Sequence, residues 1–401
     1  MPFTASLAGE VADFDPTDFI LPKKARRMGR VSQFAVASAL MAARDAALDW
    51  DRENREQIAV CFGTSVGGLK EAFEAHDSML AKQYKHTNPF TMTTTFPNAV
   101  SAEVSIALGT HGECETYSIG CSSTANAVGR AYDLIRSHDV DIAVVGGAEA
   151  PLHPTIFSAM DAGRTLAPDQ GGTIRNLPRP FDRTRCGIVL GEGAGALLLE
   201  ELEFARARGA KIWGEVVGVG SSTVADKIGK PNLEKAVGQA VKMALADAKL
   251  DAKDIGHIHA HGLSTKAADA SEAQALAEIF PSSTPVVAAA STTVMAHHGW
   301  GGYQSAEFEI EGTVTHDVTF NGPHATMKIT VNDQVWDLTL APPARTAQAG
   351  LKSGIIPVGA TILAHGHRHV DPKRFDTDGI FAPEVDRSRT ETRLRCAPVH
   401  G

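Results

Sequence analysis

The sequence reads Tyr117-Ser118-Ile119-Gly120-Cys121-Ser122-Ser123-Thr124 at the point that decides its fold. Small residues follow a short strand-like run, and Ala, Val, Leu and Ile then recur at helical spacing as far as Ile135. This order predicts a strand, a sharp turn and an α-helix. Cys121 would lie at the turn, with the start of the helix directed at its sulfur. Units of this kind build α/β sheets.

Cys121 is the candidate nucleophile. Amide groups and the helix dipole at a helix start stabilise a thiolate, lower its pKa and form an oxyanion hole for a thioester carbonyl. A lone cysteine in an apolar context is usually an inert buried thiol, but the position at the turn favours the reactive interpretation. The other cysteines are Cys61, Cys114, Cys186 and Cys396. They are dispersed and form no CxxC pair, so neither a disulfide framework nor a cysteine zinc site is predicted.

Short apolar runs alternate with helix-like segments from about residue 58 to residue 290. The predicted strands are 58–63, 142–147, 194–199, 212–219 and 255–260, and the predicted helices include 69–76 and 233–250. The first two strands end in glycine-rich turns, and the strands are continuously apolar rather than alternating. Strands of this kind are buried on both faces, so the pattern predicts an α/β architecture with mainly parallel sheets between helices.

A second candidate stretch reads His257-Ile258-His259-Ala260-His261-Gly262-Leu263-Ser264-Thr265. Its three histidines alternate at period two and share one face of a strand, which suits a metal site on spacing alone. Asp269 and Glu272 follow, but no cysteine or carboxylate is placed to complete a metal shell. His261 stands at the mouth of the turn, where acid/base or oxyanion chemistry is the better interpretation.

The composition is that of a soluble globular protein with two or more domains. The chain has 401 residues, of which 43% are hydrophobic and 21% charged, and its mean hydropathy is -0.10. No apolar run is long enough for a membrane helix and no leader-like stretch opens the chain, so we expect a cytoplasmic protein. The formal charge of -9 argues against non-specific nucleic-acid binding. The basic cluster of Lys23, Lys24, Arg26 and Arg27 is the exception, and such runs are usually solvated surface.

The pattern changes after about His298. Residues 308–315 and 325–331 alternate polar and apolar side chains at period two, as half-exposed strands do, and residues 336–340 and 358–363 continue this texture. The end of the chain, from Asp371, is polar and charged and is expected to be loose. We therefore place a boundary between Thr284 and His298, where an α/β region gives way to a small all-β one.

Taken together, the motifs resemble those of the β-ketoacyl-acyl carrier protein synthase II family over about residues 5–288. The matching stretches are the Cys121 turn, residues 10–16, residues 26–28, the run Arg179-Pro180-Phe181-Asp182-Arg183-Thr184-Arg185, the run Gly191-Glu192-Gly193-Ala194-Gly195, and residues 260–265. Taken alone, residues 191–196 would pass for a dinucleotide-binding fingerprint. A strand-like run follows them rather than a helix, so that interpretation is poor.

The resemblance implies a thiolase-like fold of two similar α/β halves in five layers, αβαβα, usually as a homodimer. It implies that Cys121 takes an acyl chain from acyl carrier protein (ACP), that malonyl-ACP then loses carbon dioxide, and that the enolate condenses with the acyl group, in fatty acid or polyketide biosynthesis. Two neutral histidines hold the malonyl thioester oxygen. His261 matches the first, and His298 falls in the register of the second. No organic or metal cofactor is implied, and the basic cluster would help to dock the acidic carrier protein.

The chain also departs from that family. It begins after the strand and glycine turn with which the family starts, and the family's C-terminal glycine-phenylalanine segment is missing, so we expect a thiolase-like body incomplete at both ends. Thr293 replaces the lysine of the family's next motif. These departures leave open a relative that acylates Cys121 or decarboxylates malonyl-ACP but does not condense. The expected domains are 1–200 and 201–290 for the two halves, 296–370 for a β-rich domain and 371–401 for a loose tail.

From about residue 296 the chain instead resembles small exported bacterial β-domains of unknown function. Their mature N-terminus begins with a His-His pair, here His297-His298, and a later motif is matched by Asn321-Gly322-Pro323-His324. A gene fusion, a truncated gene product or an assembly error would each produce this combination. A function of another class also stays open, a metal-binding module, because imidazole suits copper, nickel and zinc. Its candidate ligands are His297, His298, His324, His365, His367 and His369.

Overall fold

The computed structural model describes residues 3–50, 53–82, 88–169, 177–227, 230–288, 303–319, 326–339, 357–369, 376–378, 382–383 and 392–395. The chain divides into two compact units, residues 1–295 and residues 296–401. No helix within the described ranges is long and apolar enough to cross a membrane.

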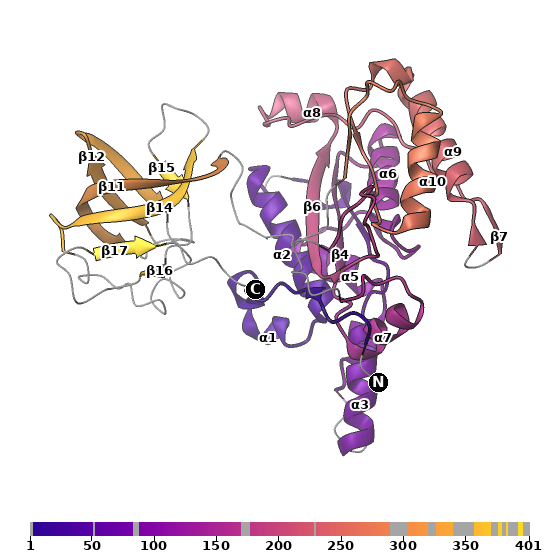
Figure 1. The fold of residues 1–401 in the computed structure, drawn as a ribbon, viewed down its shortest axis with the longest axis horizontal. Coiled ribbons are helices and arrows are strands. Elements are labelled where there is room, and N and C mark those ends of the chain that lie inside the picture. Colours follow the sequence, from indigo (N-terminus) through magenta and orange to yellow (C-terminus); the bar gives the residue numbers. More distant parts are fainter. Residues whose placement is uncertain are drawn as a thin grey trace. The chain divides into compact units, whose positions relative to one another are not determined.

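The first unit is built on a four-stranded sheet in the order β3-β2-β4-β6. Figure 1 labels two of these strands, β4 and β6. Its strands are β2 (Ile58–Gly63), β3 (Cys114–Tyr117), β4 (Ile142–Glu149) and β6 (Gly193–Glu200). β2 runs parallel to β3 and β4, and β6 runs antiparallel to β4. Every residue of β2 is buried. A strand covered on both faces has no solvent side, which explains its continuously apolar sequence.

Helices cover both faces of this sheet, as the sequence predicts. They are α2 (Arg30–Asp45), α5 (Ala99–Leu108) and α6 (Ser123–Arg136). Ile58, Val60 and Phe62 of β2 belong to the core that α2 and α5 share with one face of the sheet. Ala59 and Cys61 belong to a second core, on the face covered by α6. Successive side chains of a strand point to opposite faces, so β2 contributes to both cores.

Further elements of the described first unit surround this sheet. The helices are α1 (Pro22–Ala25), α3 (Leu69–Lys82), α4 (Thr91–Thr95), α7 (Pro154–Ala162), α8 (Leu202–Ala207), α9 (Leu233–Ala248) and α10 (Lys266–Ala277). Short strands pair as β1 (Ala8–Gly9) with β5 (Leu190–Gly191), β7 (Ala225–Lys227) with β8 (Lys230–Pro231), and β9 (Ile258–His259) with β10 (Val286–Val287). α9 lies against α10, and Arg136 of α6 pairs with Asp247 of α9 at 2.7 Å.

The strand predicted over residues 212–219 is wrong. Residues 211–224 form no strand, and the backbone runs beside α9 instead. A Cβ added to Gly218 would lie 2.6 Å from the carbonyl oxygen of Ala244, and the Val219 amide donates to Asp247 at 3.0 Å. Only this end of the segment lies against α9, because Ile212, Trp213 and Val217 are exposed. The strand predicted over residues 255–260 exists but is shorter, as β9.

The glycine-rich stretch at residues 191–195 ties the N-terminal segment to the sheet. The Glu192 side chain, 1% exposed, pairs with Arg30 at 2.5 Å and accepts a hydrogen bond from the Val11 amide at 3.2 Å. Arg30 also donates to the Val11 carbonyl at 2.9 Å. The stretch itself runs into a strand, β6, which begins at Gly193, so it lacks the helix that a dinucleotide-binding turn requires.

The second unit is all-β, as predicted. Its strands are β11 (Tyr303–Thr319), β12 (Thr326–Val331), β13 (Gln334–Thr339), β14 (Thr361–His369), β15 (Asp376–Asp378), β16 (Ala382–Pro383) and β17 (Thr392–Arg395). Met327 and Ile329 on β12, and Trp336 and Leu338 on β13, are buried, so the side chains alternate at the expected period of two. Three short strands, β15 to β17, lie within the segment expected to be loose, and all three pair within this sheet.

The start of α6 rests on two glycines of the first sheet. Gly63 ends β2, and Gly147 on β4 is its neighbour in register. A Cβ added to Gly63 would lie 2.6 Å from Thr124 Cα, and one added to Gly147 would lie 3.0 Å from Thr124 Cβ. No side chain fits at the first of these distances. The helix that follows Cys121 can therefore approach the sheet only because both positions lack a Cβ.

We predict that Gly63→Ala lowers the free energy of unfolding of the first unit by about 3 kcal/mol, because the added methyl group overpacks the contact between β2 and α6. Gly195→Ala on β6 is the matched control, since nothing lies within 4 Å of its added Cβ. Denaturant unfolding of the two variants beside the parent chain measures the difference. Equal midpoints for the two variants would contradict the close approach.

Candidate active site

Cys121 lies in the turn between β3 and α6, as predicted. Gly120 adopts a left-handed conformation, with φ of 82°, which favours glycine. The Ser123 hydroxyl accepts a hydrogen bond from the Ile119 amide at 2.9 Å and donates one to the Gly120 carbonyl at 2.6 Å. The first residue of α6 thus closes the turn around the cysteine, whose side chain stays accessible to solvent.

The structure brings Cys121 and His261 together. A side-chain hydrogen bond with His261 is the main cause that lowers the pKa of the Cys121 thiol, and the charge of the imidazole lowers it further. Partial burial of the sulfur and the Glu149 carboxylate act in the opposite direction. The sequence attributed thiol activation to the helix start, whereas the backbone amide makes a smaller contribution than the histidine does. Cys121 is therefore a thiol with an imidazole beside it that lowers its pKa, as in an activated nucleophile.

His261 is held by its own backbone. It follows β9, and its amide and that of Gly262 donate to the two oxygens of Glu272 on α10, at 2.7 and 3.0 Å. The hydrogen bond with Cys121 raises the pKa of the imidazole, burial lowers it, and the charges of Glu272 and Asp269 raise it further. Both effects therefore act toward a thiolate and an imidazolium, whereas the family resemblance implied a neutral histidine.

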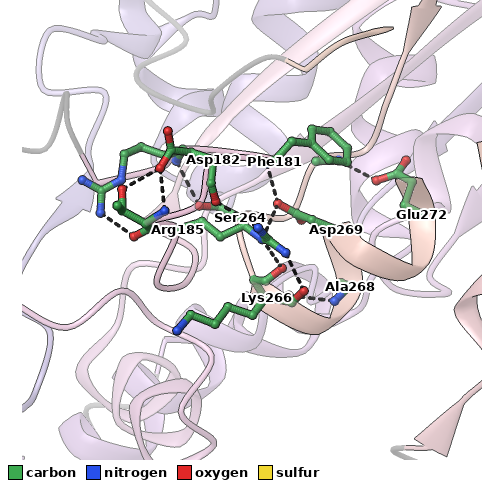
Figure 2. Close-up of polar contacts among 12 residues, drawn as sticks. Phe181, Asp182, Arg185, Ser264, Lys266, Ala268, Asp269 and Glu272 are labelled. Carbon is green, nitrogen blue, oxygen red and sulfur yellow. Dashed lines mark hydrogen bonds and ion pairs between the residues drawn. The ribbon is translucent and has the colours of Figure 1, made fainter. Parts of the chain in front are cut away.

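The loop at residues 179–185 holds the His261 turn from the other side. Figure 2 shows Asp269 of α10 at the centre of these contacts: it accepts from the Phe181 amide at 2.8 Å and lies 3.4 Å from Arg185 Nε. Arg185 also donates to the carbonyl of Lys266 at 2.7 Å, and the Ser264 hydroxyl accepts from the Arg179 amide at 2.9 Å. Two motifs far apart in the sequence therefore form one buried support for His261.

The other candidate residues are not brought to this site by the described structure. Cys61 is buried, which raises its thiol pKa to about 12, and burial also raises the pKa of Cys114. Cys396, His298 and Thr293 lie outside the described residues. Within the residues whose side chains are described, no group of three His, Cys, Asp or Glu side chains could hold a metal ion.

The structure does not describe the side chains of the candidate ligands of the metal-binding module. His297, His298 and His324 lie outside the described residues, and His365, His367 and His369 are described only as backbone of β14.

Glu149, the last residue of β4, is not among the site residues predicted from the sequence. Its carboxylate lies close enough to Cys121 to raise the pKa of the thiol. A sign of it was present, because Glu149 closes an apolar strand of a parallel sheet at the carboxyl end, where α/β proteins place their sites. The predicted strand was ended two residues too early, at Gly147.

Comparison with known proteins identifies the family. The β-ketoacyl synthase N-terminal domain matches residues 3–205, and the β-ketoacyl synthase C-terminal domain matches residues 213–307. The chain belongs to the β-ketoacyl synthase family. It is 36% identical over 299 residues to 3-oxoacyl-[acyl-carrier-protein] synthase 2 of Staphylococcus aureus, a match that covers 74% of this chain and 73% of that protein.

Solved structures agree with this assignment. A β-ketoacyl synthase from Burkholderia phymatum superposes with a TM-score of 0.66 at 32% identity, over 72% of this chain and 70% of that one. A ketosynthase bound to a hexaketide, in complex with a type II PKS acyl-carrier protein, gives a TM-score of 0.64 at 26% identity, over 73% of this chain and 71% of that one. These matches confirm the predicted thiolase-like layered αβαβα class. They also confirm the predicted enzyme class, an acyltransferase of the 3-oxoacyl-ACP synthase type in fatty acid or polyketide biosynthesis.

We predict that iodoacetamide alkylates Cys121 well before Cys61, with a midpoint pH below that of an ordinary thiol, because the lowered pKa keeps the thiolate populated as the pH falls. Replacing the histidine by His261→Asn removes the stabilising partner and should move the midpoint to higher pH. Peptide mapping of each cysteine over a pH series measures both effects. Equal labelling of Cys61, or an unmoved midpoint in His261→Asn, would show that the pair does not activate the thiol.

Proposed function

We propose that Cys121 forms the acyl-enzyme of this synthase and that His261 serves it in both half-reactions. The observation that supports this is the placement of the His261 imidazole beside the Cys121 thiol, which shifts the pKa of each group toward its charged form. In the first half-reaction the thiolate attacks the thioester carbonyl of acyl-ACP. The new carbon–sulfur bond forms on Cys121, the bond to the carrier breaks, and the imidazolium supplies the proton for the leaving thiolate. Amide groups at the turn would stabilise the intermediate oxyanion.

In the second half-reaction malonyl-ACP loses carbon dioxide and leaves an enolate. The enolate carbon attacks the thioester on Cys121, so a carbon–carbon bond forms, the bond to the cysteine breaks and the thiolate is regenerated. The His261 ring is neutral during this half-reaction, because it has given up one proton. Its remaining N–H donates a hydrogen bond to the malonyl thioester oxygen, where negative charge gathers. His298 is the proposed second donor to that oxygen. The imidazole then takes up one proton from solvent, which restores the starting pair.

The proposed partner is an acyl carrier protein. The structural neighbour described above is a ketosynthase in complex with such a protein. In this chain Lys23, Lys24, Arg26 and Arg27 are all exposed, and the guanidinium carbon of Arg27 lies 4.9 Å from the centre of the Phe90 ring. An exposed basic cluster suits an acidic partner, and its contribution should weaken with salt.

Assembly and location complete the proposal. We propose a homodimer, as the family implies. The free thiols of Cys61, Cys114, Cys121 and Cys186 suit a reducing compartment such as the cytoplasm. The division of residues 1–290 into two halves stays a hypothesis. For the second unit, the resemblance to exported β-domains and the metal-binding alternative also stay hypotheses.

We predict that the chain acylates Cys121 faster than it forms ketoacyl-ACP, because acyl transfer needs only the activated thiolate and nearby donors, while Thr293 cannot replace a lysine's charge. Single-turnover transfer from acyl-ACP, measured beside ketoacyl-ACP formation from malonyl-ACP, tests this. His261→Ala should lower condensation by roughly 10²–10³-fold, as loss of one oxyanion donor does.

Cys121→Ala is the blank in this assay and should show neither step, while Cys114→Ala removes another accessible thiol and should show both. Acyl transfer that survives in Cys121→Ala would refute the proposed acyl-enzyme. Condensation as fast as acyl transfer in the parent chain would refute the predicted imbalance.

A further inference from the structure

Glu149 makes an unusual set of hydrogen bonds for a carboxylate beside a nucleophile. One of its oxygens, Oε1, accepts from the Thr64 hydroxyl at 2.8 Å, from the Ser65 amide, and from the Val66 amide at 3.4 Å. All three donors belong to the turn that follows β2. The carboxylate therefore joins the end of β4 to the turn at the end of the neighbouring strand.

The same turn reaches the segment that carries Cys121. The Thr64 amide donates to the carbonyl of Tyr117, the last residue of β3, at 2.9 Å. The Ser118 hydroxyl donates to the Ser65 carbonyl at 3.3 Å. Thr64 is 2% exposed, so this chain of contacts begins in the protein interior. It runs from Glu149 through the turn to Ser118, three residues before Cys121.

The negative charge of Glu149 raises the pKa of the Cys121 thiol, whereas its hydrogen bonds hold the turn next to the Cys121 segment. Its three donors are a hydroxyl and two amides, which are neutral, and burial raises the pKa of this carboxyl while the donors lower it. Of the groups that act on Cys121, His261 lowers the thiol pKa and Glu149 raises it. A carboxylate that disfavours the thiolate is difficult to explain as an activator of the thiol. Its contacts with the turn offer the better explanation.

We propose that Glu149 is a positioning residue, whose carboxylate clamps the Thr64–Val66 turn to the end of β4 and thereby fixes the segment that presents Cys121. This proposal rests on the proposed function in one respect only, that Cys121 is the nucleophile. A buried acceptor for three donors holds a short turn in one conformation. A carboxylate oxygen accepts all three, and the carbonyl oxygen of an amide can replace it.

Two substitutions separate the clamp from the charge. Glu149→Gln keeps an oxygen at the acceptor position and removes the charge, whereas Glu149→Ala removes both. Glu203→Gln, at an exposed position of α8, controls for the loss of one negative charge. Three readouts are measured for each variant: the pH midpoint of Cys121 alkylation by iodoacetamide, amide hydrogen exchange in residues 64–66 and 117–121, and single-turnover acyl transfer from acyl-ACP.

We expect Glu149→Gln to lower the alkylation midpoint, because a nearby negative charge that raises the thiol pKa is lost. Its hydrogen exchange should stay at the parent level. Glu149→Ala should lower the midpoint as well, speed exchange in both peptides and slow acyl transfer by roughly 10–100-fold, since small displacements at a reacting centre are costly. Glu203→Gln should match the parent chain in every readout.

Parental exchange rates in Glu149→Ala would overturn the clamp, and so would equal loss of acyl transfer in the glutamine and alanine variants. Should Glu149→Ala fail to fold, Thr64→Val removes one of the three donors at nearly unchanged side-chain volume. Faster exchange in residues 65–66 of that variant would support the clamp, and parental exchange would overturn it. Absence of acyl transfer in the parent chain would count against the proposed function alone, because the exchange and alkylation readouts do not depend on it.

Discussion

The contact between the first turn of α6 and the sheet is the constraint on which the rest of the site depends. Gly63 and Gly147 sit side by side on two parallel strands, and Thr124 lies where their side chains would otherwise be. Because the helix lies this close to the sheet, the turn that precedes it and carries Cys121 lies at the carboxyl ends of β2 and β4. Sites of α/β proteins collect at that edge, because neighbouring parallel strands all end there.

Carboxylates then set the electrostatics around this contact. Glu272 and Asp269 are buried behind the His261 turn, and their charges raise the pKa of the imidazole. Glu149 stands on the Cys121 side and raises the pKa of the thiol. The hydrogen bond between thiol and imidazole outweighs the opposing effects on both partners. Each carboxylate also accepts backbone amides, so the groups that tune the charges hold the loops that carry the reacting residues.

The main elements of this arrangement were predictable from the sequence, and the contacts between them were not. The unbroken apolar run of β2 and the small residues around Cys121 predict the sheet and the turn, because burial and a tight turn each leave a local pattern. The pairing of Cys121 with His261 joins residues far apart in the chain, and only the resemblance linked them. Glu149 fell beyond the predicted strand, which was ended at Gly147. The apolar run at residues 212–219 misled because it forms no strand, and its large side chains Ile212, Trp213 and Val217 are exposed. The placement of His298 lies outside the described residues.

The central claim is that Cys121 and His261 form one coupled ionisable pair, and an NMR titration of the His261 ring tests it most directly. The ring resonances can be assigned by their loss in His261→Asn and followed over pH in the parent chain and in Cys121→Ala. The account predicts a parent midpoint above the ordinary histidine value of about 6.5. It also predicts a lower midpoint in Cys121→Ala, because the thiolate that stabilises the imidazolium is gone. The same midpoint in both proteins would contradict the coupling and, with it, the proposed activation of the nucleophile.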